Sequence, residues 1–276
     1  MKNSKALAAK LRADTLRIIR SAGGGHIGGD LSVMDILTEL YFRQMKISPE
    51  NPNDPERDLF VLSKGHSVEA YYAVLAEKGF FSLDEVLGSI GTVGTPFIGH
   101  PNNKLPGIEM NSGSLGHGLP VCVGMALGQR MLGRSARVYT VLGDGELAEG
   151  SVWEAAMAAG HYKLDNLCAV VDRNGLQISG PTETVMAQDP QLERWSAFGW
   201  HAIPAHGNDP ASLHEAFTQA KQTKGKPTVI VAHTVKGCGV SFMENRAEWH
   251  HRMPTDDEFV QAFTELAAAG ERALDE

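Results

Sequence analysis

The sequence predicts an α/β fold, a parallel sheet with helices on both faces. Two observations support this prediction. Short, continuous apolar runs, which are typical of strands buried on both faces of a sheet, recur along the chain. Longer segments with apolar residues at helical spacing separate them, and strands that alternate with helices form parallel sheets. The predicted strands are Leu59–Leu62, Val138–Leu142, Leu167–Asp172 and Thr228–Ala232.

The predicted helices follow from apolar residues spaced three and four positions apart. The segment 32–43 shows this spacing, and Ser32 is a suitable N-cap for it. The stretch from Gly91 to Gly113 has no such pattern, and a loop of this length in a compact domain is usually functional. The other helices are predicted at 4–21, from after His66 to Lys78, and at 83–90, 115–132, 150–162, 210–222 and 255–270.

Length, charge and cysteine content exclude several classes of protein. A chain of 276 residues can form one large domain, and no internal repeat or long linker divides it. The net charge of −8 and the lack of Lys/Arg runs argue against a nucleic-acid-binding surface. No apolar stretch approaches the ~18–20 residues that span a bilayer, so no membrane association is expected. Cys122, Cys168 and Cys238 have no metal-binding spacing and fit a reducing, cytoplasmic location.

The most informative motif lies where two predicted strands end. Gly143-Asp144-Gly145 follows the strand Val138–Leu142, and Asn174 follows the next strand, 174 − 144 = 30 residues after Asp144. Open α/β sheets bind ligands beyond the carboxyl ends of their strands, so Asp144 and Asn174 should lie together there. Mg²⁺ takes oxygen ligands and prefers few protein groups beside phosphate oxygens and water. The pattern therefore predicts a diphosphate–Mg²⁺ site with Asp144, the Asn174 amide and the Leu176 carbonyl as ligands.

Both glycine motifs also have an ordinary structural interpretation. Gly143-Asp144-Gly145 alone is as often a simple turn, and only Asn174 favours the functional interpretation. The glycines between Gly113 and Gly118 lack the GxGxxG spacing, and no clear strand precedes them, so a nicotinamide site is weakly supported. These glycines also fit the start of a helix that packs closely against a ligand.

Several separated motifs, taken in order, resemble those of transketolases. The segment from Gly143 to Asn174, with Glu149–Ala155 inside it, resembles their thiamine-diphosphate signature, and Ser63-Lys64-Gly65-His66 resembles one of their active-site loops. The resemblance extends over nearly the whole chain. It implies a thiamine-diphosphate-binding fold with thiamine diphosphate and Mg²⁺ as cofactors, and Ca²⁺ or Mn²⁺ as alternatives to Mg²⁺. The other matching segments are Ser21–Ser32, Gly99-His100-Pro101, Ser112–Gly116, Lys236–Asn245 and Trp249-His250.

The same resemblance implies which residues contact the cofactor. Asp144, Asn174 and Leu176 would bind the metal. The cofactor-binding residues would be His66, Gly113, Ser114, Leu115, Gly143, Asp144, Gly145, Glu149 and Asn174.

Four histidines in polar or glycine-rich loops are the candidate catalytic residues. The resemblance implies that His26, His66, His100 and His250 line the substrate channel. There an imidazole, with an unperturbed pKa of about 6.5, can bind hydroxyls and transfer protons near neutral pH. Without the resemblance, each would more often be a loop histidine with a satisfied hydrogen bond. Only the Trp-His order favours His250 over its neighbour His251.

Other polar residues near the motifs keep two interpretations. His117 either touches the diphosphate or fills the position where many relatives have glutamine. Glu149 and Glu154 are surface charges or, as the resemblance implies, part of a dimer-interface network. Lys236 either neutralises a phosphate or is solvated. The remaining histidines match no catalytic motif and are interpreted as structural: His161, His201, His206, His214 and His233.

The resemblance also implies a missing half. A full transketolase is more than twice this length, and its pyrimidine and C-terminal domains carry the glutamate that activates the cofactor. Residues 1–276 are therefore expected to form a single diphosphate-binding domain. A C-terminal partner subunit would supply the rest in an α2β2 assembly.

The expected activity is transfer of a two-carbon ketol group from a ketose phosphate to an aldose. The Glu-Asn…Trp-His tail and the Gly-His-Pro loop favour it over two relatives with the same cofactor, a deoxyxylulose-phosphate synthase and the α subunit of an oxo-acid dehydrogenase. A non-catalytic cofactor-binding module is the alternative from another class. Asp144, Asn174 and the loop histidines argue against it, because such a module has no chemical need for them. The sugar substrates stay open between pentose phosphates and a specialised pathway.

Overall fold

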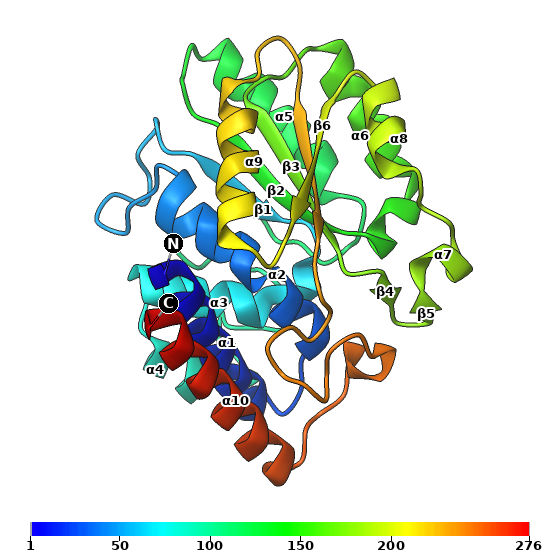
Figure 1. Cartoon of the computed structure of the whole chain (residues 1–276). Coiled ribbons are helices and arrows are strands. Elements are labelled where there is room, and N and C mark those ends of the chain that lie inside the picture. Colours follow the sequence, from blue (N-terminus) through cyan, green and yellow to red (C-terminus); the bar gives the residue numbers. More distant parts are fainter. Residues whose placement is uncertain (1, 276) are drawn as a thin grey trace.

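A parallel sheet of five strands forms the centre of the molecule, in the order β1-β2-β3-β7-β6 (Figure 1). This computed structural model describes residues 2–275. Every neighbouring pair of strands in this sheet is parallel. A second, two-stranded sheet is antiparallel and lies directly after β3 in the chain. The strands are β1 (Leu59–Leu62), β2 (Val138–Gly143), β3 (Leu167–Arg173), β4 (Leu176–Gln177), β5 (Gly180–Pro181), β6 (His201–His206) and β7 (Thr228–His233).

Helices cover both faces of the sheet, which confirms the predicted fold class. α2, α3 and α9 pack on one face, and α5, α6 and α8 pack on the other (Figure 1). The helices are α1 (Lys2–Ala22), α2 (Ile27–Glu39), α3 (Val68–Lys78), α4 (Leu83–Ser89), α5 (Gly118–Met131), α6 (Gly150–His161), α7 (Thr182–Val185), α8 (Gln191–Ala197), α9 (Pro210–Gln222) and α10 (Asp256–Asp275).

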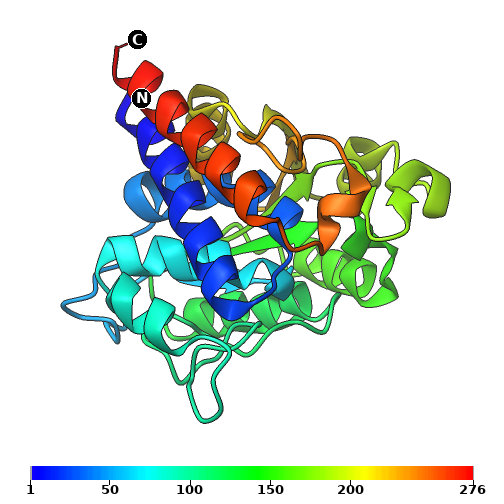
Figure 2. The same cartoon turned by 90° about the horizontal axis from the view of Figure 1, so that it is seen from below.

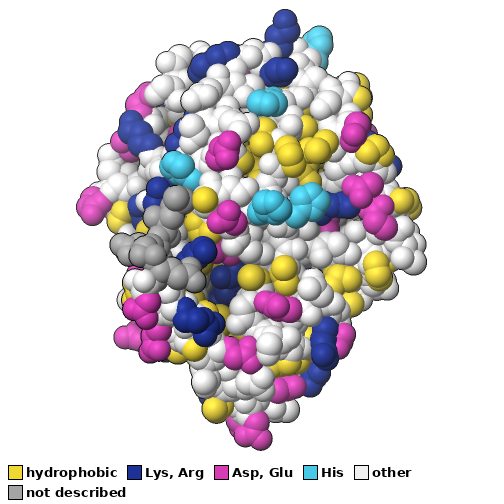
Figure 3. All heavy atoms as spheres, viewed as in Figure 1, with side chains coloured by type: hydrophobic (Ala, Val, Ile, Leu, Met, Phe, Trp, Pro, Cys, Tyr) yellow, Lys and Arg dark blue, Asp and Glu magenta, His cyan; other side chains and the backbone are white. Residues whose placement is uncertain are grey.

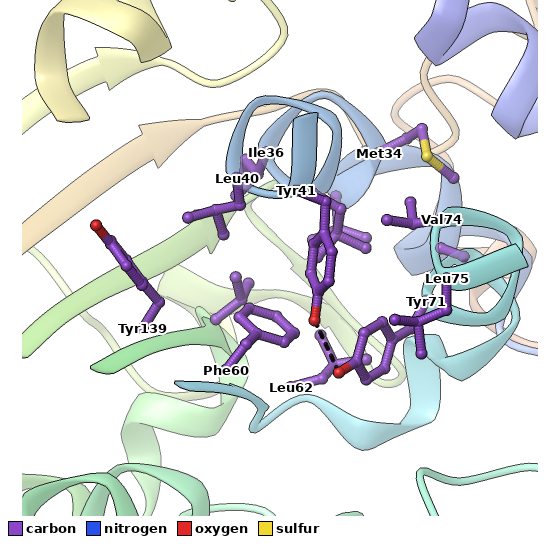
Figure 4. Packing of buried hydrophobic residues seen from close by; sticks show 14 of the residues in the cluster. Met34, Ile36, Leu40, Tyr41, Phe60, Leu62, Tyr71, Val74, Leu75 and Tyr139 are labelled. Atoms are coloured by element: carbon purple, nitrogen blue, oxygen red, sulfur yellow. Dashed lines mark hydrogen bonds between the residues drawn. The ribbon is translucent and has the colours of Figure 1, made fainter. Parts of the chain in front are cut away.

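Alternate side chains of each central strand enter opposite cores. In β2, Tyr139 and Val141 face the α2–α3–α9 layer, whereas Val138 and Leu142 face the α5–α6–α8 layer. This follows from the two-residue period of a strand. Figure 4 shows the first of these cores, in which the Tyr41 hydroxyl donates to the Tyr71 hydroxyl at 2.9 Å.

The two terminal helices form a third layer. α1 and α10 lie side by side, and the two ends of the chain are close together (Figure 2). Ile19 of α1 and Leu266 of α10 are buried in a cluster that also contains Ile27, Met243 and Trp249. This cluster fixes the segment after β7 against the start of α2, which positions Trp249-His250 beside His26.

The predicted start of the second helix is wrong. The helix begins at Ile27 rather than after Ser32, and Ser32 is fully buried in its second turn. The Ser32 hydroxyl donates to the Asp172 carboxylate at 2.6 Å and lies 3.0 Å from the Gly29 carbonyl. The prediction failed because Gly28 and Gly29, which are poor helix formers, stand in the first turn.

Strand β6 was not predicted at all. Its sequence, HAIPAH, mixes polar residues with Pro204, and a proline argues against an internal strand. β6 lies at the edge of the sheet and pairs only with β7, so a missing N–H at Pro204 is tolerated. The loop predicted from Gly91 to Gly113 is confirmed as free of helices and strands.

The surface matches the expectation from composition. On the face shown in Figure 3, basic and acidic side chains are interspersed. Between residues 2 and 275, no helix is both long and apolar enough to cross a bilayer.

Candidate functional site

A cavity of about 370 Å³ lies at the carboxyl ends of β2 and β3, and most of the predicted site residues line it. It is bordered by the loops after β1, β2, β3 and β7 and by the start of α2. Loops that are far apart in sequence meet here because the carboxyl ends of parallel strands share one edge of the sheet. The predicted residues in its wall are His26, His66, His100, Gly113, Leu115, Gly143, Asp144, Gly145, Asn174, Leu176, Lys236 and His250.

Asp144 and Asn174 lie together at the base of this cavity. Gly143 at the end of β2 is opposite Asp172 in β3, so the loops after the two strands are neighbours. The Asp144 carboxylate accepts from Gly145 N at 2.8 Å and from Gly175 N at 2.6 Å, which ties the two loops together. Burial, and next the nearby Asp172 carboxylate, raises the pKa of Asp144 to about 6.

The donor set at this position fits a Mg²⁺ ion bound with a diphosphate. One carboxylate, one amide oxygen and one backbone carbonyl are hard oxygen donors, and phosphate oxygens and water can complete an octahedron. The described residues contain no cluster of three or more His, Cys, Asp or Glu side chains that could hold a metal without such help. The Asn174 amide oxygen accepts from Leu176 N at 3.1 Å, which fixes the orientation of this amide.

Two buried lysines give the cavity a positive lining. Lys236 is 1% exposed, so it is not a solvated surface lysine, and its ammonium lies 3.3 Å from the Leu176 carbonyl. Burial, and next the nearby Lys64, lowers the pKa of Lys236 to about 8. Lys64 is also buried and pairs with Asp172 at 2.5 Å. An anionic diphosphate would therefore meet one cation, Lys236, that is not already neutralised by a salt bridge.

The glycine-rich loops approach one another too closely for side chains. A Cβ atom on Gly118 would lie 2.3 Å from the Ser63 hydroxyl oxygen, and one on Gly113 would lie 2.4 Å from a ring carbon of His100. Gly113 also has a φ of 134°, which other residues rarely adopt. Glycine is required at both positions by packing, and this explains the cluster without a GxGxxG motif.

His26, His66 and His250 form a compact group in the cavity wall. The ring centroid of His26 is 5.0 Å from that of His66 and 5.5 Å from that of His250. Burial lowers the pKa of His26 to about 4 and that of His250 to about 3, and it lowers the pKa of His66 as well. Neighbouring rings and the two lysines add to these shifts. All three imidazoles are therefore neutral at pH 7.

His250 and His251 are distinguished by their contacts. The ammonium of Lys236 donates to Nδ1 of His250 at 2.9 Å, so the proton of the neutral ring lies on Nε2. His250 lines the cavity, whereas His251 is exposed and stacks edge-on against His26 at 4.7 Å. His100 is exposed at the rim of the cavity.

Several of the residues considered in the sequence lie outside the cavity wall. Ser114 is exposed and hydrogen-bonds the exposed His117, whose Nδ1 also lies 3.1 Å from the Leu115 carbonyl. Glu149 is exposed at the N-cap of α6, and Glu154 is exposed on the same helix. Their positions leave an interface role for both glutamates as a prediction.

Two buried carboxylates beside the cavity were missed by the sequence analysis. Asp172 accepts from Lys64, Ser32 and Thr234, and Glu146 accepts from three loops. Both residues lie within two positions of the motif residues in sequence. Nothing in a local pattern shows which of several neighbouring carboxylates turns inward.

The low pKa of His26 leads to a measurable prediction. Its ring should stay neutral from pH 8 down to about pH 5 and gain its proton near pH 4. Because the folded-state pKa lies below the ordinary value of 6.5, the unfolded chain binds more protons between these values, and the stability of the fold should fall as pH drops from 6.5 towards 4. NMR titration of ¹³C-labelled histidine, assigned with a His26→Gln variant, measures this pKa. A midpoint at pH 6 or above would contradict the predicted environment.

Comparisons with known proteins identify the relatives of this site. The profile described as "Transketolase, thiamine diphosphate binding domain" matches residues 3–270. One of the two subunits of an apulose-4-phosphate transketolase from Phocaeicola vulgatus is 47% identical over 258 residues, which is 94% of this chain and 92% of that protein. A 6-deoxy-6-sulfo-D-fructose transketolase subunit from Clostridium sp. (strain MSTE9) is 43% identical over 94% of each chain. The solved transketolase of Campylobacter jejuni superposes on the whole chain with a TM-score of 0.90 at 26% identity, and the match covers 46% of it.

Proposed function

The chain belongs to the transketolase family through its thiamine-diphosphate-binding domain, and on that premise we propose that it is the diphosphate-binding subunit of a two-chain transketolase. The observation that supports this proposal most directly is the cavity at the ends of β2 and β3. It brings Asp144, Asn174 and the Leu176 carbonyl beside Lys236 and three neutral histidines. These groups suit a diphosphate–metal ligand and a polar, proton-accepting substrate.

Each part of the cavity has a role in this proposal. Thiamine diphosphate, when bound, supplies the nucleophilic carbon and the electron sink for carbon–carbon bond cleavage. Asp144, Asn174 and Leu176 would hold Mg²⁺ on its diphosphate, with Ca²⁺ or Mn²⁺ as alternatives, and Lys236 would neutralise a phosphate oxygen. His26, His66, His100 and His250 would bind the donor carbonyl and hydroxyls and transfer protons as the bond breaks and forms.

The partner chain is supported by the names of the relatives. Two proteins that the chain matches over more than nine-tenths of their length are named as transketolase subunits. They are not named as synthases or dehydrogenase subunits, and this favours ketol transfer over those alternatives. We infer that residues 1–276 constitute the diphosphate-binding domain, and that a C-terminal subunit carries the pyrimidine-binding domain in an α2β2 assembly. The sugars in the names of the two relatives differ, so the substrate is to be found by assay.

The location follows from the thiols. Cys122, Cys168 and Cys238 are all unpaired in the structure. Free thiols persist in reducing compartments, and sugar phosphates are produced there, so we place the enzyme in the cytoplasm.

Reconstitution tests the proposal. The chain is purified alone and together with the protein encoded next to its gene, and ketol transfer is assayed with thiamine diphosphate, Mg²⁺ and a panel of ketose phosphates. We expect activity only from the mixture, and a sedimentation mass equal to two copies of each chain. Activity from this chain alone would refute the two-chain arrangement.

Removal of one imidazole should affect turnover more than binding. His66→Ala in the reconstituted enzyme should lower kcat by about 100-fold or more, since positioned proton transfer contributes about 10²–10⁴-fold. His66 is enclosed by the cavity wall, and burial keeps its ring neutral and able to accept a proton. Steady-state kinetics with saturating cofactor gives kcat and KM separately.

A matched control for His66→Ala is His206→Ala. His206 is exposed at the end of edge strand β6 and does not line the cavity. We expect its kcat to stay within about twofold of the wild-type value, because surface substitutions of this kind are usually neutral. Equal losses in both variants would contradict a catalytic role for His66.

A further inference from the structure

Three loops that border the cavity meet at one buried carboxylate, Glu146. This residue lies in the 3₁₀ helix Gly145–Ala148, two positions after Asp144, and it is 2% exposed. Asp144 begins the same turn, so the turn carries the predicted metal ligand on one side and Glu146 on the other.

Both oxygens of Glu146 are used as acceptors. Oε1 accepts from Gly116 N at 2.9 Å and from the Ser63 hydroxyl, and Oε2 accepts from Gly143 N at 3.0 Å. Gly116 belongs to the loop before α5, Ser63 to the loop after β1, and Gly143 to the end of β2. One side chain therefore connects the three segments whose neighbours Leu115, Lys64 and Asp144 line the cavity.

We propose that Glu146 is the positioning residue of the cofactor site: its carboxylate holds these three loops in register before the diphosphate and its metal bind. This inference rests on the proposed function, because it assigns a role at the same site. It differs from a direct contact with the cofactor. A carboxylate beside a diphosphate would repel it, whereas a carboxylate that already accepts from three donors acts through the backbone that they belong to.

The chemistry of these contacts requires a carboxylate. Burial raises the pKa of Glu146, and the three donors lower it again, so the buried charge is compensated by hydrogen bonds. A glutamine has the same shape but only one acceptor oxygen. Its NH₂ group would face either Gly116 N–H or Gly143 N–H, and two donors cannot bond each other. One buried backbone N–H would then lose its partner.

The packing around Glu146 leaves little room for the loops to adjust. A Cβ atom on Gly118 would lie 2.3 Å from the Ser63 hydroxyl oxygen, and one on Gly116 would lie 2.6 Å from Cβ of Glu149. Where backbones already touch, a shift of one loop moves the others. A change at Glu146 should therefore reach the positions of Leu115 and Asp144 in the cavity wall.

The experiment compares Glu146→Gln with the wild type in the complex of this chain and its partner subunit. Calorimetry with thiamine diphosphate and Mg²⁺ should show a dissociation constant raised by about 10- to 100-fold, the usual loss when the support of a metal site is removed. At saturating cofactor, kcat should stay within about threefold of the wild-type value. Hydrogen exchange at Gly116 and Gly143 without cofactor should become faster, since their acceptor is impaired.

Glu193→Gln is the matched control, because Glu193 is an exposed glutamate in the first turn of α8 and does not line the cavity. It should bind the cofactor and exchange like the wild type. Wild-type affinity in Glu146→Gln, with or without faster exchange, would overturn the inference. Failure of the wild-type complex to bind thiamine diphosphate would instead refute the proposed function.

Ser63→Ala decides the question if the glutamine variant does not fold. It removes one donor and keeps both backbone contacts of Glu146. Loss of a single hydrogen bond predicts a dissociation constant raised by about fivefold. An unchanged constant in Ser63→Ala would overturn the inference in that case.

Discussion

Asp144→Ala should abolish metal-dependent binding of thiamine diphosphate at ordinary cofactor concentrations. The substitution removes the one carboxylate among the predicted metal ligands. It also removes the acceptor of Gly145 N and Gly175 N, which joins the loops after β2 and β3. Loss of one partner from a buried, hydrogen-bonded charge pair costs about 2–5 kcal/mol, and about 1.4 kcal/mol corresponds to tenfold. We therefore expect the dissociation constant to rise at least about 100-fold.

Calorimetry of the reconstituted enzyme with Mg²⁺ and thiamine diphosphate measures this loss. Asp144→Asn keeps one oxygen but not the charge, so it should fall between the wild type and Asp144→Ala. Asp84→Ala removes an exposed aspartate of α4 that does not line the cavity, and it should bind as the wild type does. Unchanged binding by Asp144→Ala would refute the assignment of Asp144 as a metal ligand.

The sheet could be predicted because its strands are apolar throughout. β1, β2, β3 and β7 are buried on both faces and appear as continuous apolar runs, and all four were predicted. β6 was missed because only one of its faces is well buried and Pro204 interrupts it. An edge strand needs fewer apolar residues and fewer hydrogen bonds, so it has a weaker sequence pattern.

The loops that form the cavity could be predicted from their motifs, but their support could not. Asp144 and Asn174 were identified because each closely follows an apolar strand, and parallel strands end at the same edge. Glu146 and Asp172 were missed, although each is two positions from one of these residues. Their burial depends on which donors reach them from β1, α2 and the loop before α5, and those contacts exist only in the folded chain.

Ser32 illustrates the same limit from the opposite direction. A serine before an apolar helical segment is a typical N-cap, and the local pattern favoured that role. In the structure its hydroxyl donates to Asp172, 140 residues away, and the helix starts earlier, after His26. The start at Ile27 has a functional consequence, because it places His26 at the helix end that faces the cavity.

The second large effect concerns the partner subunit. The cavity contains groups for a diphosphate and its metal, and it contains the histidines. The transketolase resemblance implies that the glutamate which activates the cofactor lies in another domain. If that domain is on a partner chain, this chain alone can bind cofactor components but cannot turn over substrate. The expected difference in activity between the isolated chain and the complex is therefore all or none.

A titration tests this central claim most directly. The partner chain is added stepwise to a fixed amount of this chain, with saturating thiamine diphosphate, Mg²⁺ and a productive ketose donor, and the rate of ketol transfer is recorded. We predict no transfer at zero partner and a linear rise that saturates at one partner chain per copy of this chain. Turnover without partner, or a rate that does not depend on the partner, would contradict an active site completed by two chains.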